Sequence, residues 1–164
     1  MLIARSVHPL PGEAERKARL LSLVDNFGGR RVMVVGDLIA DEFIYGEVHR
    51  VSREAPVLIL KYDTTEIVAG GAGNAANNVA ALGGSATLAG LVGADEEGRR
   101  LLAGLPRDVD RRQVVRTKGY RTPVKTRILA GGIHSAKQQI VRIDRETGWP
   151  LEEAVSLVVR FSEF

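Results

Sequence analysis

Two carboxylates lie where an α/β fold usually binds a ligand. Asp37 and Asp41 follow the run 31–35, whose β-branched and apolar residues predict a strand buried on both faces of a parallel sheet. Ligands in such folds bind beyond the carboxyl ends of the strands, so both side chains are expected at that edge. For Asp37 the alternative is a cap on the turn after the strand.

A glycine-rich turn is the most informative segment of the chain. Gly70 and Gly71 precede a run of small residues that predicts a helix over 70–82. Glycines at a helix start let a ligand approach the backbone closely, and the first turn of the helix offers unpaired N–H groups to oxygen atoms. Asn74 can cap the helix or offer its amide to a hydroxyl group. The alternative is a tight turn with close helix packing.

The same turn also fits a different motif. Residues 71–76 match the G-x-G-x-x-A fingerprint of dinucleotide-binding folds, and Asp95 follows about 20 residues later, after a predicted strand. This interpretation predicts an oxidoreductase fragment. It leaves the carboxylates after the first strand unexplained, and it places the glycines later in the chain than such folds usually do.

Two cations alternate along a predicted strand. Lys125 and Arg127 lie in the strand candidate 124–130, so both side chains fall on one face, where they suit the binding of a phosphate group. The alternative is an exposed basic face. Arg50 and Glu54 lie in a polar segment between strand candidates, where each either contacts a ligand or caps a surface turn.

The remaining pattern predicts an α/β domain with an early β insertion. Apolar residues at helical spacing predict a helix over 13–27, which Gly28 and Gly29 end. Three short strands without helices between them predict a small antiparallel sheet. The predicted short strands are 43–48, 57–62 and 64–68, and the later elements are strands 86–92, 113–117, 124–130 and 138–143 and helices 95–105 and 151–164.

Composition excludes several classes of function. The net charge is only +3 and the basic residues are scattered, which argues against a nucleic-acid partner. There is no cysteine, so no disulfide or thiolate chemistry is available. The apolar runs are far shorter than the ~20 residues of a membrane span, and no secretory signal is evident, so a cytoplasmic location is expected. The histidines His8, His49 and His134 have no metal-ligand spacing, and no metal site is expected.

Chained motifs resemble the ribokinase-like, or PfkB-type, carbohydrate kinases, and more narrowly the bacterial heptose-7-phosphate kinases of ADP-heptose synthesis. The resemblance runs from about Arg31 to Asp144. Its motifs are 34–41, 45–46, 50–57, 70–76 with Gly83 and Gly93, 121–127 and 138–144. It implies a partial ribokinase-like three-layer α/β fold over 1–164, in which 1–29 form a leader and N-terminal helix and 43–68 an antiparallel β lid.

The resemblance also implies roles for individual residues. In that family the residues matched by Asp41, Gly71 and Asn74 bind sugar hydroxyls, and Gly70 belongs to the same turn. A carboxylate accepts from hydroxyls, while backbone N–H groups and an amide donate to them. Asp37, Arg50, Lys125 and Arg127 complete the set of candidate substrate-binding residues, with a sugar phosphate as the ligand. The lid often joins two subunits in the family, so a homodimer through it is expected.

One family motif does not occur in the 164 residues. The Gly-Ala-Gly-Asp turn, whose aspartate is the family's general base, is absent, as are the nucleotide-binding strands and the acidic motif associated with Mg²⁺. We therefore expect no catalytic residue here, and ATP and Mg²⁺ to act only in the complete enzyme. The alternatives are a non-catalytic sugar-phosphate-binding module, the oxidoreductase fragment, or a partly stable gene fragment.

Overall fold

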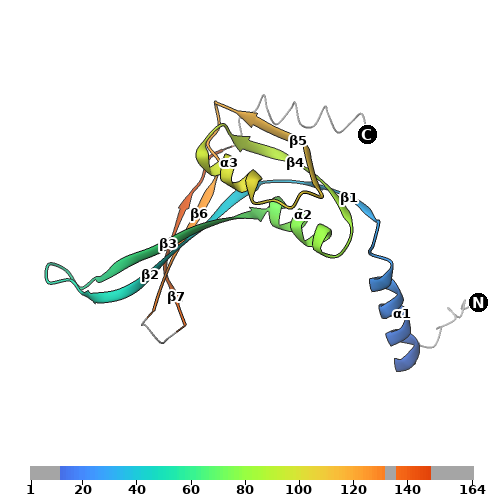
Figure 1. Cartoon of the computed structure of the whole chain (residues 1–164), viewed down its shortest axis with the longest axis horizontal. Helices are drawn as coiled ribbons and strands as arrows, with labels where there is room; N and C mark the ends of the chain where they lie inside the picture. Colours follow the sequence, from blue (N-terminus) through green and yellow to red (C-terminus); the bar gives the residue numbers. More distant parts are fainter. Residues whose placement is uncertain (1–11, 132–135, 149–164) are drawn as a thin grey trace, which may run out of the picture.

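Two β-sheets and three helices make up the described part of the chain. The computed structural model describes residues 12–131 and 136–148. A parallel body sheet has the strand order β1-β4-β5, and a lid sheet has the order β3-β2-β6-β7 (Figure 1). The body sheet consists of β1 (Arg31–Val35), β4 (Ser85–Gly93) and β5 (Val109–Thr117). The lid sheet consists of β2 (Leu38–Val51), β3 (Leu58–Gly71), β6 (Val124–Gly131) and β7 (Gln138–Arg145).

The lid sheet differs from its prediction. An antiparallel pair is present as expected, but β2 and β3 are two long strands, and the three short strands predicted from sequence are wrong. Only two residues separate β1 from β2, which leaves the body with β3 as a twisted ribbon (Figure 1). β6 adds to β2 in parallel, and β7 pairs with β6 antiparallel. Residues far along the chain therefore lie beside the opening carboxylates.

Small residues let helix α2 pack closely on the sheets. α2 (Ala72–Ala81) begins two residues later than predicted, because its N-cap Gly71 has a φ of 57° that does not belong to a helix. Gly73 is buried against Ala69 and Leu38, and a Cβ there would collide with the Ala69 side chain. The other helices are α3 (Glu96–Ala103) and α1 (Glu13–Asp25), of which α1 has no buried residue.

The main core joins both sheets to α2 and α3. Leu38 and Ala40 of β2 are almost fully buried and pack with Leu88 of β4 and Leu101 of α3. Burying each of these leucine side chains stabilises the fold by roughly 1.5–3 kcal/mol. Because two residues of β2 belong to this core, the start of the lid sheet is fixed to the body.

The prediction that β1 is buried on both faces is wrong for the described residues. β1 pairs with β4 in parallel as predicted, yet Val32, Met33 and Val35 are 38–55% exposed. β1 is an edge strand of the body sheet, with a strand on one side only. The predicted leader over 1–11, the helix over 151–164, His8 and His134 lie outside the described residues.

Candidate functional site

The lid sheet has one face that the core does not cover. Side chains alternate along a strand, so the residues between and after the buried Leu38 and Ala40 point to the opposite side of β2. We call this side the open face. Its central residues are Ile39, Asp41, Phe43 and Tyr45 of β2 with Lys125 and Arg127 of β6.

Asp41 and Arg127 form an ion pair on the open face. Arg127 Nη1 donates to Asp41 Oδ1 at 2.5 Å, and each side chain is about one fifth exposed. The other carboxylate oxygen lies against the backbone of Gly70, where a Cβ would collide with it. Asp41 thus lies against two other predicted site residues, Gly70 and Arg127, although the three come from three different strands.

Aromatic rings support the cations of this face. The Arg127 guanidinium lies 5.2 Å from the centroid of the Phe43 ring, and the Phe43 and Tyr45 rings stack with centroids 6.4 Å apart. The Lys137 ammonium lies 5.3 Å from the Tyr45 ring and pairs with Asp63. Phe43 and Tyr45 were missed from sequence, although their spacing of two from Asp41 on a strand was a usable signal.

A pocket at the edge of the open face contains two further predicted residues. Asp37 and Lys125 line a cavity of about 310 Å³ together with Ile39 and Tyr120. Lys125 is the Cα partner of Asp41 in the pairing of β2 with β6. Its side chain makes no ion pair within the described part of the chain, so it is a free cation beside the Asp41–Arg127 pair.

The glycine turn connects the same region to α2. Gly71 leaves no room for a Cβ because the Asp37 carbonyl oxygen lies against it, and that oxygen accepts a hydrogen bond from the Ala72 N–H at 2.9 Å. Asn74 does not cap the helix, since Gly71 is the N-cap. The Asn74 side chain is exposed in the first turn of α2, and among the described residues it has no hydrogen-bond partner.

Arg50 is not brought to this site within the described chain. It lies near the far end of β2, nine residues beyond Asp41, which corresponds to about 30 Å along an extended strand. Its side chain is exposed, and so is that of His49 beside it.

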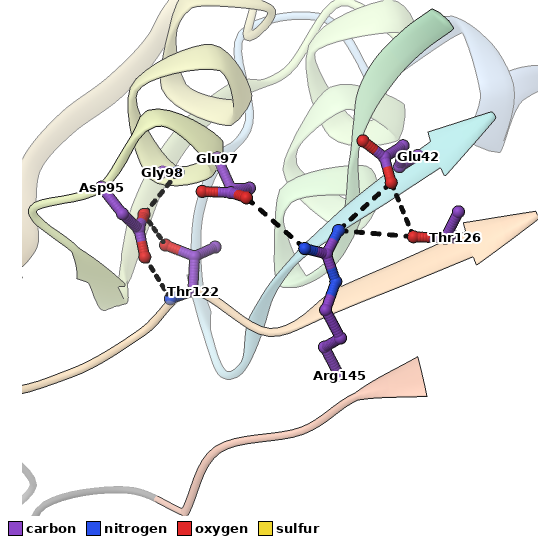
Figure 2. A network of polar contacts seen from close by, with 7 residues as sticks. All are labelled: Glu42, Asp95, Glu97, Gly98, Thr122, Thr126 and Arg145. Atoms are coloured by element: carbon purple, nitrogen blue, oxygen red, sulfur yellow. Dashed lines mark hydrogen bonds and ion pairs between the residues drawn. The ribbon is translucent and has the colours of Figure 1, made fainter. Parts of the chain in front are cut away.

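Asp95 does not serve as the ribose-binding acid that the dinucleotide fingerprint requires. Its carboxylate accepts hydrogen bonds from the Gly98 N–H at 2.9 Å and from the Thr122 N–H and hydroxyl at 2.8 and 2.7 Å (Figure 2). The buried Thr122 hydroxyl in turn accepts from the Gly93 N–H. Asp95 therefore caps α3 and holds the loop before β6.

The titration of Asp95 reflects these bonds. Burial by itself raises the pKa of Asp95, but the hydrogen bonds from Thr122 and Gly98 outweigh it and hold the pKa below 3.8. Residues 71–76 also follow β3, which belongs to the lid sheet, whereas the next strand belongs to the body sheet. Both observations argue against the oxidoreductase interpretation.

A second polar network lies on the covered side of the lid sheet. Arg145 of β7 donates to Glu42 at 3.2 Å and lies 3.7 Å from Glu97 of α3, while the Thr126 hydroxyl donates to Glu42 at 2.6 Å (Figure 2). This network links the lid sheet to α3 from the side opposite the Asp41–Arg127 pair.

The described residues do not offer a fitting site for a resident metal ion. Residues 12–131 and 136–148 contain no group of three or more acidic or histidine side chains placed to hold one. In the same ranges, no helix has the length and apolarity needed to cross a membrane.

Comparison with known proteins defines the class. Residues 30–159 match the model of the pfkB family carbohydrate kinases, which is more than half of the chain. The chain belongs to this family. It is 44% identical over 131 residues to the bifunctional protein HldE of Trichlorobacter lovleyi and 41% identical over 138 residues to that of Hyphomonas neptunium. These matches cover 79% and 84% of this chain but only 26% and 27% of the relatives, so the chain spans about a quarter of their length.

Solved structures show the same fold. Phosphofructokinase-2 from Escherichia coli, in complex with fructose-6-phosphate, aligns with a TM-score of 0.57 at 18% identity, covering 82% of this chain and 42% of that one. Ribokinase from Arabidopsis thaliana, complexed with ribose and ATP, aligns with a TM-score of 0.55 at 20% identity, covering 80% of this chain and 42% of that one. The predicted fold class, a partial ribokinase-like α/β fold with an antiparallel lid, is confirmed.

Proposed function

We propose that the chain is the sugar-binding part of an ATP-dependent kinase that acts on heptose 7-phosphate. In the complete enzyme the γ-phosphoryl group of ATP passes to a sugar hydroxyl, with Mg²⁺ on the nucleotide phosphates. The family membership and the similarity to the HldE proteins support this proposal. On this proposal the chain acts in the cytoplasm, where ATP is available.

One observation carries the choice of ligand. Asp41 lies against the Gly70 backbone, and the cations Arg127 and Lys125 lie on the same face of the sheet. A half-buried carboxylate that is partly accessible suits sugar hydroxyl groups, whereas two neighbouring cations suit a phosphate. The open face therefore offers groups for the hydroxyls and groups for the phosphate of a sugar phosphate in one site.

The remaining candidates have secondary roles in this proposal. Asp37 lines the pocket with Lys125, and Gly71 gives the backbone its shape there. Asn74 presents a free amide in the first turn of α2 to the sugar. Arg50 is too far along β2 to join them within one chain, so its role here is limited to the lid.

We expect these 164 residues by themselves to bind the sugar phosphate without turnover. The sequence has no Gly-Ala-Gly-Asp turn to supply the base and the anion hole, and phosphoryl transfer depends on such positioning and charge stabilisation. A non-catalytic sugar-phosphate-binding module would use the same site. The two functions differ in whether the longer protein transfers phosphate from ATP.

Calorimetric titration with D-glycero-D-manno-heptose 7-phosphate tests the binding function. Lys125→Met should weaken binding about 10- to 100-fold, because it removes one charge-assisted hydrogen bond to the phosphate. Lys17→Met, on the exposed helix α1, removes the same charge far from the site and should bind like the wild type. Equal affinity of all three proteins, or stronger stabilisation by NAD than by the sugar phosphate, would contradict the proposal.

We further propose that the lid mediates a homodimer. β3 is an edge strand of the lid sheet; Leu58 and Tyr62 at its outer end, and Val57 directly before it, are 44–65% exposed. An edge with exposed apolar side chains is a ready surface for a second copy. Light scattering should give about twice the chain mass of 17.8 kDa, and Tyr62→Lys should restore that of a single chain. A wild-type protein of single-chain mass at all concentrations would refute the dimer.

A further inference from the structure

We infer that Arg127 makes the open face select phosphorylated sugars over free sugars, because it occupies Asp41 until a phosphate group draws it away. The inference rests on the proposed function and concerns the same site. It assigns to one ion pair a role in discrimination between ligands, beyond simple attraction of the phosphate.

Both oxygens of Asp41 already have neighbours. Oδ1 accepts from Arg127 Nη1 at 2.5 Å, and Oδ2 lies against the Gly70 backbone. A sugar hydroxyl that approaches Oδ1 must therefore compete with a guanidinium, and the Gly70 backbone restricts the approach to Oδ2. A neutral hydroxyl makes a weaker hydrogen bond to a carboxylate than a guanidinium does, so a free sugar gains little from this exchange.

Arg127 has a second support when it leaves Asp41. Its guanidinium lies 5.2 Å from the centroid of the Phe43 ring, and this contact holds the cation on the open face without Asp41. Lys125 lies on the same face of β6, two residues away, and makes no ion pair in the described part of the chain. A phosphate dianion on this face thus meets one free cation and one that can be released.

The two ligands therefore face different exchanges. A sugar phosphate replaces the Asp41–Arg127 contact with an Arg127–phosphate contact, which can be bidentate, and leaves Asp41 free to accept from the sugar hydroxyls. A free sugar has no phosphate to offer Arg127, so the free energy lost with the ion pair is subtracted from its binding free energy. Because each side chain of the pair is about one fifth exposed, the pair is partly screened and the penalty is modest.

Arg127→Met separates this role from simple attraction. The methionine keeps an apolar stem over Phe43 but cannot pair with Asp41. Calorimetry on the whole chain should show that the affinity for heptose 7-phosphate falls about 10- to 100-fold. The affinity for unphosphorylated D-glycero-D-manno-heptose should rise about two- to fivefold, since Asp41 is then unoccupied. Lys125→Met removes a cation without freeing Asp41, so it should weaken the phosphate ligand and should not raise the affinity for free heptose. Lys17→Met on the exposed helix α1 is the neutral control and should leave both affinities unchanged.

Each outcome decides between the two proposals. Unchanged or weaker binding of free heptose by Arg127→Met overturns the role of the ion pair, even where the phosphate ligand binds as proposed. Failure of the wild-type chain to bind heptose 7-phosphate refutes the proposed function itself. If Arg127→Met does not fold by circular dichroism, the ¹⁵N resonance of the Arg127 Nε–H in the wild type gives the answer. That resonance should shift on saturation with heptose 7-phosphate, and its constancy would overturn the inference.

Discussion

Gly71→Ala is expected to lower the free energy of unfolding by about 3 kcal/mol and to weaken sugar-phosphate binding, because it combines backbone strain with a collision. Gly71 has φ 57° and ψ −129°, a region that residues with a side chain almost never adopt. A Cβ would also strike the Asp37 carbonyl oxygen, which accepts from the first N–H of α2. The change therefore acts at the point where the lid sheet, α2 and the pocket meet.

Denaturant unfolding measures this loss, and Gly28→Ala provides the control. Gly28 lies in a turn with no atom near its missing Cβ and without a positive φ, so its replacement should change stability by less than about 0.5 kcal/mol. Equal stability of the two variants would show that the turn at Gly71 can relax without cost.

Asp95→Ala is expected to destabilise the fold by about 2–4 kcal/mol, the sum of a lost helix cap and of donors left without an acceptor. The carboxylate accepts from Gly98 and twice from Thr122, which is buried. Glu96→Ala, in the same turn of α3, removes only an exposed ion pair and should unfold at nearly the same urea concentration as the wild type. Urea unfolding of both variants tests this difference, and a loss below 1 kcal/mol for Asp95→Ala would contradict it.

The same carboxylate predicts a dependence on pH. The pKa of Asp95 is lower in the folded chain than its ordinary 3.8, so its contribution to stability is present above pH 3.8 and is lost as the pH falls through the folded pKa. The stability difference between wild type and Asp95→Asn should thus be constant near neutral pH and shrink below 3.8. The hydrogen bond from Arg112 holds the pKa of Asp110 at about 2. Asp110 titrates in both proteins, so its contribution cancels in the stability difference between them.

Local patterns predicted the elements, whereas distant pairing decided their extent and exposure. The helix over 13–27 and the strand over 31–35 were predictable because their periodicity and the glycines between them are local signals. The length of β2 was not, since its pairing with β3 and β6 depends on residues far along the chain. The exposure of β1 has the same origin: apolar composition predicts burial, but an edge position does not appear in the strand's own sequence.

The site shows the same division. Lys125 and Arg127 were placed on one face by the period of two, without any knowledge of the fold. Their position beside Asp41 was not predictable, because it depends on the parallel pairing of β2 with β6. This pairing brings Asp41 and Arg127, 86 positions apart, into contact. Asp95 matched a nucleotide motif by its spacing, and only its bonds to Thr122, 27 positions later, assign it a structural task.

β2 is anchored in the core at its start and reaches far beyond the core at its end, so a small tilt at the start moves the end over a larger distance. Leu38 is fixed in the core, whereas Val51 is 60% exposed at the tip of the ribbon. The extended segment from Asp41 to Val51 spans about 33 Å, so a tilt of about 5° near Asp41 displaces the tip by about 3 Å. The chain has no cysteine, so a single thiol introduced beside Val51 would carry a fluorescent label that reports occupancy of the distant pocket.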